Sequence, residues 1–78
     1  MMKITGKQFT LLQDFMFHCW NVYHNKTKSA FDFWAERLDE AKIPWSIQNL
    51  AASLMEDREN GFRYFRELLS LKGIEIME

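Results

Sequence analysis

The sequence predicts an all-α fold, a compact small domain of four helices in which residues 1–78 form one unit. Apolar residues recur with the three-and-four spacing of amphipathic helices along most of the chain. The single proline and the three glycines fall where these segments start or stop. Hydrophobic residues make up 47% of the chain, which is enough for one core and too many for a disordered protein.

The first helix is expected to span residues 6–24 and has the strongest start signal in the chain. Thr5, with Gln8 three residues later, matches a capping box, and Ile4 with Phe9 forms the hydrophobic staple around it. About half of the helix circumference is apolar. This arc consists of Phe9, Leu11, Leu12, Phe15, Met16, Cys19, Trp20, Val22 and Tyr23.

The second helix is expected to run from about Ala30 to Lys42, with Ser29 as its N-cap. Pro44 ends it, because proline lacks an N–H donor and biases the preceding residue away from helical angles. Its apolar stripe consists of Phe31, Trp34, Ala35, Leu38 and Ala41. The opposite, solvated side carries Asp32, Glu36, Asp39 and Glu40.

The third helix is expected to have Ser46 as its N-cap. Its stripe consists of Ile47, Leu50, Ala51, Leu54 and Met55. One continuous helix to residue 72 is the alternative, but it places Arg58 and Gly61 on the apolar side. We therefore predict a break at residues 57–60 and two separate helices.

The fourth helix has a clear stop signal, because Gly73 can adopt the left-handed conformation that follows a helix and Ile74 can then contact Leu69. We expect the first and fourth helices to supply most of the core. Residues 74–77 and 2–5 alternate as strands do. A two-stranded clip between these segments is therefore an additional expectation.

The net charge and the single cysteine indicate in which cellular compartment the protein resides, but they do not identify a binding partner. The formal net charge is −1, so no overall field attracts nucleic acid or anionic lipid. Cys19 has no second cysteine to pair with, as is usual in a reducing compartment. The first residues lack the apolar stretch of a secretion signal, and no window is long enough to span a membrane. We expect a cytoplasmic protein.

No set of residues predicts catalysis, a cofactor or a metal. His18 and Cys19 lie on different sides of the first helix, and the six-residue spacing of His18 and His24 does not match the spacing of helical metal ligands. We interpret Cys19 as a core residue and both histidines as surface residues. Glycine-rich phosphate loops, nucleophile elbows and metal-ligand clusters are missing from the sequence. The sequence predicts a protein that is not an enzyme.

Two aromatic residues do not fit a simple helical bundle. Phe17 falls on the polar side of the first helix, and Phe33 falls on the acidic side of the second. Burial of a Phe side chain contributes about 1.5–3 kcal/mol, so either these helices are buried on two sides or the rings meet a partner. Our hypothesis is that Phe17, Phe33 and Trp45 form an apolar patch for another protein or a second copy.

The only basic cluster comprises Arg58, Arg63 and Arg66, which could hold a phosphate or a carboxylate. Glu59 and Glu67 are within pairing reach, so local salt bridges are the preferred interpretation.

These features favour a small protein-protein interaction module, an accessory or inhibitor type that binds a larger protein. Such helical proteins are common among phages and other mobile elements, so an origin of that kind belongs to the prediction. The alternative is a helix-turn-helix regulator, whose third helix would present Ser46, Gln48 and Asn49 to base edges. Against it, the second helix carries four acids where phosphate contact needs bases, and the turn lacks its usual glycine.

Overall fold

The computed structural model describes residues 2–56 and 60–77 and confirms the four-helix domain. It also confirms the clip. In chain order the elements are β1 (Met2–Thr5), α1 (Gly6–Asn25), α2 (Phe31–Glu40), α3 (Trp45–Leu54), α4 (Gly61–Leu71) and β2 (Ile74–Met77). The two strands pair in parallel, with Met2 beside Ile74 and Thr5 beside Met77.

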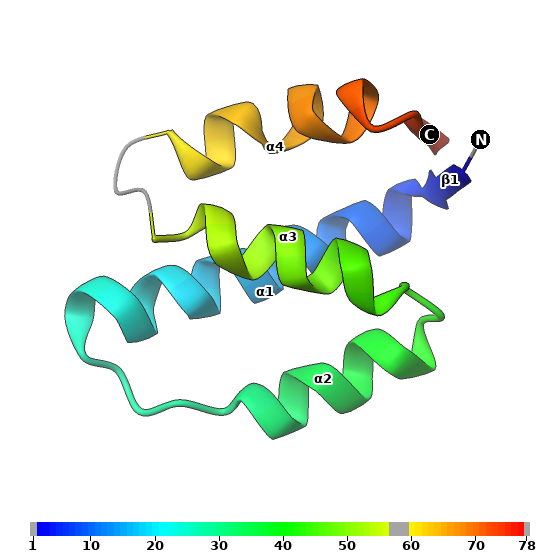
Figure 1. Cartoon of the computed structure of the whole chain (residues 1–78). Helices are drawn as coiled ribbons and strands as arrows, with labels where there is room; N and C mark the ends of the chain where they lie inside the picture. Colours follow the sequence, from blue (N-terminus) through cyan, green and yellow to red (C-terminus); the bar gives the residue numbers. More distant parts are fainter. Residues whose placement is uncertain (1, 57–59, 78) are drawn as a thin grey trace.

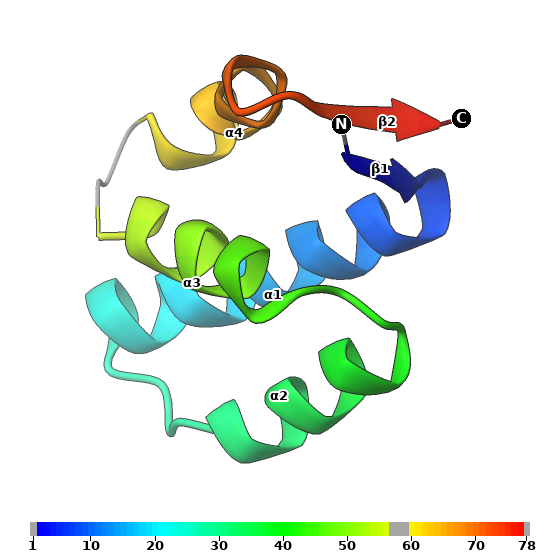
Figure 2. The same cartoon turned by 45° about the vertical axis from the view of Figure 1, so that its right-hand side comes forward.

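The helices surround a single core. In Figures 1 and 2, α3 lies between α2 and α4, and α1 passes behind α3. The clip lies at the end of the molecule where α1 begins and α4 ends. None of the helices in the described part of the chain has the length and hydropathy that a membrane-spanning segment needs.

The capping box predicted for the first helix is present. The Gln8 N–H donates to Thr5 Oγ1 at 3.1 Å, and the Thr5 N–H donates to Gln8 Oε1 at 2.7 Å. Ile4 and Phe9 are both buried around this start. The same Gln8 side chain donates from Nε2 to the Ala41 carbonyl at 2.8 Å, so the start of α1 is tied to the end of α2.

Both predicted ends of the second helix are wrong by one or two residues. α2 begins at Phe31 with Ala30 as its N-cap, and Ser29 only accepts a long 3.4 Å hydrogen bond from the Phe31 N–H. At the other end Lys42 takes φ 61°, the left-handed position usually given to glycine. The N–H groups of Lys42 and Ile43 donate back to the Asp39 and Leu38 carbonyls, so a Schellman motif ends α2 before Pro44 is reached.

Ser46 is not the N-cap of the third helix. α3 begins at Trp45, and the Pro44 carbonyl accepts the N–H groups of Ile47 and Gln48 at 3.0 and 3.2 Å. Pro44 already has extended angles and a fixed φ of −58°, so it serves as the cap residue without a side-chain bond. The chain therefore enters the helix one residue earlier than the serine signal predicts.

The predicted break between the third and fourth helices is present, since α3 ends at Leu54 and α4 begins at Gly61. The predicted left-handed position at Gly73 is also confirmed, at φ 77°. Of the predicted break, residues 57–59 lie outside the described residues.

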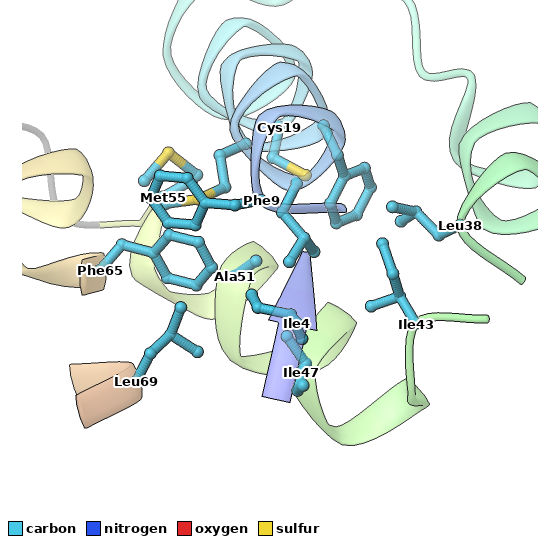
Figure 3. Packing of buried hydrophobic residues seen from close by; sticks show 13 residues of the cluster. Ile4, Phe9, Cys19, Leu38, Ile43, Ile47, Ala51, Met55, Phe65 and Leu69 are labelled. Carbon is cyan, nitrogen blue, oxygen red and sulfur yellow. The ribbon is translucent and has the colours of Figure 1, made fainter. Parts of the chain in front are cut away.

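Figure 3 shows the core, where side chains from every helix meet. The expectation that the first and fourth helices supply most of it is confirmed, since they contribute seven of the thirteen buried hydrophobic residues among those described. α1 buries Phe9, Leu12, Phe15, Met16 and Cys19. α3 buries Ile47 and Ala51, the turn after it buries Met55, and α4 buries the large side chains of Phe65 and Leu69. α3 contacts both α1 and α4.

Candidate functional site

A continuous row of rings crosses the surface between α1 and α2. Neighbouring ring centroids are 6.3 Å apart from Tyr23 to Phe31, 5.5 Å from Phe31 to His18, 5.9 Å from His18 to Trp34 and 5.8 Å from Trp34 to Phe33. Such separations are those of stacked and edge-to-face aromatic pairs. We call this set the aromatic ridge, and it consists of His18, Tyr23, Phe31, Phe33 and Trp34, with Arg37 above it.

The exposed end of the aromatic ridge lies on the outward side of α2. Phe33 is 55% exposed, and the Arg37 guanidinium lies 5.6 Å from its ring centroid and 5.2 Å from that of Trp34. These distances are within the range of cation-π attraction. The half-buried Trp34 therefore contacts both exposed groups, Phe33 and Arg37.

His18 contacts both the rings of the aromatic ridge and a backbone N–H group of the loop before α2. The interpretation of His18 as a surface residue is wrong. It is half-buried, with its ring between those of Phe31 and Trp34, and Nε2 accepts the Ala30 N–H at 3.1 Å. His18 thereby satisfies an N–H group at the start of α2 that Ser29 does not reach.

The other ionisable members of this region also have defined environments. The interpretation of His24 as a surface residue is also wrong, because it is half-buried and its Nε2 donates to the Met55 carbonyl at 2.8 Å, which joins the end of α1 to the end of α3. Burial raises the pKa of the Tyr23 hydroxyl, and the nearby Cys19 and Glu56 add to the shift. The Tyr23 hydroxyl therefore stays protonated at neutral pH.

Phe17 and Trp45 are exposed but do not belong to the aromatic ridge. Phe17 is 59% exposed and lies about 100° around α1 from His18, so it points away from α2. Trp45 is 73% exposed and begins α3. The structure thus leaves all three predicted interface residues exposed, and it brings only Phe33 into a cluster.

The residues proposed for nucleic-acid contact do not share one accessible surface. Ser46 and Asn49 are exposed, whereas Gln48 is only 6% exposed. Gln48 Nε2 donates to Asp39 Oδ1 and to the Ile43 carbonyl, both at 2.9 Å. Both N–H groups of this amide are used to hold the corner between α2 and α3, so neither is available to a base.

The basic cluster is only partly described. Arg58 lies outside the described residues. Arg63 is exposed on α4, and the Arg66 guanidinium lies 4.8 Å from the ring centroid of Phe9. This second cation-π contact covers the Phe9 and Phe65 stack from the outside.

Cys19 is fully buried, and burial raises the pKa of its thiol to about 12. The thiol is therefore protonated at neutral pH and is a poor nucleophile. Among residues 2–56 and 60–77, no three His, Cys, Asp or Glu side chains come close enough to hold a metal ion.

The Cys19 environment predicts a loss of stability in alkali. Because the folded pKa is raised from 9.0 to about 12, the unfolded chain releases the thiol proton first, and the contribution of Cys19 to stability is lost as the pH rises from 9 towards 12. Urea unfolding should show the free-energy advantage of the wild type over Cys19→Ala shrinking across this window. A constant difference between the two proteins would contradict the raised pKa.

In comparisons with known proteins, no protein-family model, no curated protein and no solved structure matches the chain.

Proposed function

We propose that this chain is a non-enzymatic protein-binding module of accessory or inhibitor type, which docks on a larger protein through the aromatic ridge. The observation that carries the proposal is the exposed Phe33 ring, held in place by Trp34 and Arg37 at the end of a row of contacting rings. Aromatic and Arg side chains are the residues in which binding energy concentrates at protein interfaces.

Preorganisation supports this assignment. A partner that contacts Phe33 and Arg37 meets side chains whose positions are already set by Trp34 and, behind it, by His18. Little side-chain freedom then remains to be lost on binding, which is a cost of roughly 0.5–1.5 kcal/mol for each side chain immobilised. Around Phe33 on the outward side of α2 lie the exposed carboxylates of Asp32, Glu36 and Glu40, which suit the polar rim of an interface.

The test compares two exposed phenylalanines. Phe33→Ser should reduce recovery of the bound protein from a lysate of the source organism at least tenfold, because truncation of an interface anchor costs about 2 kcal/mol or more. Phe17→Ser is the matched control, with similar exposure outside the aromatic ridge, and should leave recovery within about twofold. Quantitative mass spectrometry of proteins retained on the immobilised chain gives the readout.

Thermal unfolding separates binding from stability in the same pair. Both variants should melt within about 4 °C of the wild type, since exposed substitutions change stability by about 0.5 kcal/mol. Equal retention by Phe33→Ser and wild type would refute the proposal, and a large drop in melting temperature would identify Phe33 as a structural residue. Retention on heparin that falls steeply with salt would favour the nucleic-acid regulator instead.

A further inference from the structure

The outer edge of β2 carries hydrogen-bonding groups that have no partner in the part of the chain that the structure describes. β1 and β2 form a two-stranded sheet in which the Met2 N–H donates to the Gly73 carbonyl at 3.3 Å. Successive residues of a parallel strand direct their backbone groups alternately to the two sides. Gly73 and Glu75 thus face β1, and the N–H and C=O groups of Ile74 and Ile76 face away from it.

Within residues 2–56 and 60–77, no helix or strand covers this edge. In Figure 2 no other ribbon runs along the side of β2 that faces away from β1. The N–H and C=O groups of Ile74 and Ile76 have no hydrogen-bond partner among the described residues. A full Schellman motif at the end of α4 would include a hydrogen bond from the Ile74 N–H to the Leu69 carbonyl. This bond is not among the backbone hydrogen bonds of the described residues.

Four backbone groups in this arrangement fit one kind of ligand. An antiparallel strand placed beside Ile74 and Ile76 would exchange two hydrogen bonds with each residue, which is the closely spaced pattern of an antiparallel ladder. A hollow of about 240 Å³ at the start of β2, lined by Ser70, Gly73, Ile74 and Glu75, offers room for one of its side chains.

The negative charge of Glu75 determines which partner strand can pair with the outer edge of β2. When two copies pair through this edge, only the register that sets Ile74 opposite Ile76 of the other copy uses all four groups. That register places Glu75 directly opposite Glu75 of the other copy, and like charges directly opposite one another are destabilising. Lys3 lies beside Glu75 on the β1 side and does not remove the opposition of the two carboxylates.

We propose that the outer edge of β2 is a second docking surface, which takes an extended segment of another protein as an antiparallel third strand with a Lys or Arg opposite Glu75. The carboxylate of Glu75 rejects a second copy of the chain and attracts the cationic partner strand. This surface is separate from the aromatic ridge, which lies on α2 and the second half of α1.

The chain itself supplies the probe, because Glu75→Lys creates a strand of matching shape with a cation in the required place. Isotope-labelled wild type is titrated at millimolar concentration with unlabelled wild type and, separately, with unlabelled Glu75→Lys, and the backbone amide signals are followed by NMR. The mixture should pair at least about fivefold more tightly than wild type with itself, with the shifts centred on the Ile74 and Ile76 amides. Glu75→Lys with itself should pair as weakly as wild type.

Two further variants make the result specific to the strand edge. Ile76→Pro in the Glu75→Lys partner removes one outward N–H and should abolish the gain, whereas Ile76→Ala, which loses similar packing and keeps the N–H, should retain most of it. Glu75→Gln should pair with itself more tightly than wild type does. A mixture no tighter than wild type alone, or shifts that map elsewhere, would overturn the proposal. No residue of the aromatic ridge enters this readout, so its failure leaves the proposed function untouched.

Discussion

Phe65→Ala should destabilise the protein by about 4 kcal/mol, because the removed ring leaves a cavity in the centre of the core. Phe65 is 1% exposed, and its ring stacks on that of Phe9 at a centroid distance of 5.6 Å with the planes only 8° apart. Figure 3 shows the two rings facing each other. This stack joins α4 to α1, so its loss also removes the aromatic contact between these two helices.

The same substitution three residues earlier is the matched control. Phe62 is on α4 as well and is 42% exposed, so Phe62→Ala should cost only about 1 kcal/mol. Urea unfolding followed by circular dichroism measures both. A small domain has only about 5 kcal/mol of stability to lose, so Phe65→Ala should retain about 1 kcal/mol and be measurably unfolded near 37 °C. Equal losses for the two variants would show that the stack contributes nothing particular to the core.

Gly61→Ala should destabilise the protein by about 3 kcal/mol, although intrinsic helix propensity alone favours alanine over glycine by about 1 kcal/mol. Gly61 is buried at the start of α4, where a methyl group would collide with the Leu54 carbonyl and with the Met55 side chain. The Met55 side chain can move, but the Leu54 carbonyl belongs to the last turn of α3. The first turn of α4 would therefore have to move away from α3.

Gly73→Ala provides the comparison. A methyl group at Gly73 meets nothing within 4 Å, and the residue has φ 77°, so the only penalty is the left-handed conformation, about 1 kcal/mol. Chemical denaturation of both variants gives the two free energies. If Gly61→Ala were as stable as the wild type, the close approach of α3 and α4 described here would be incorrect.

The sequence signals that predicted the structure correctly are those that act between residues a few positions apart. The capping box at the start of α1 joins Thr5 and Gln8 by bonds that span three residues, so the residue types alone specify it. The positive φ of Gly73 likewise needs only a residue without a Cβ atom. The helical periodicity of the apolar residues was sufficient to predict four helices, and the alternating ends were sufficient to predict the clip.

Signals that depend on residues distant in the sequence were misread. Ser29 is a good N-cap residue, yet His18 on another helix takes the N–H of Ala30, which precedes α2. Lys42 adopts a left-handed conformation that its side chain does not favour, because Leu38 and Ile43, both buried, need the turn to meet in the core. In each case packing between elements outweighs a local preference of about 1 kcal/mol.

In the candidate site, too, local sequence patterns predicted some features correctly and contacts between distant residues decided the others. Helical periodicity places Phe17 and Phe33 on polar sides of their helices, and both are exposed. Periodicity describes each helix separately, so it could not show that Phe33 joins a row of rings across two helices while Phe17 points elsewhere. It also could not show that Gln48 is buried by the corner between α2 and α3. The sequence by itself determined the helices and their outward faces, and the tertiary structure decided which outward residues meet, because that depends on how separate elements pack together.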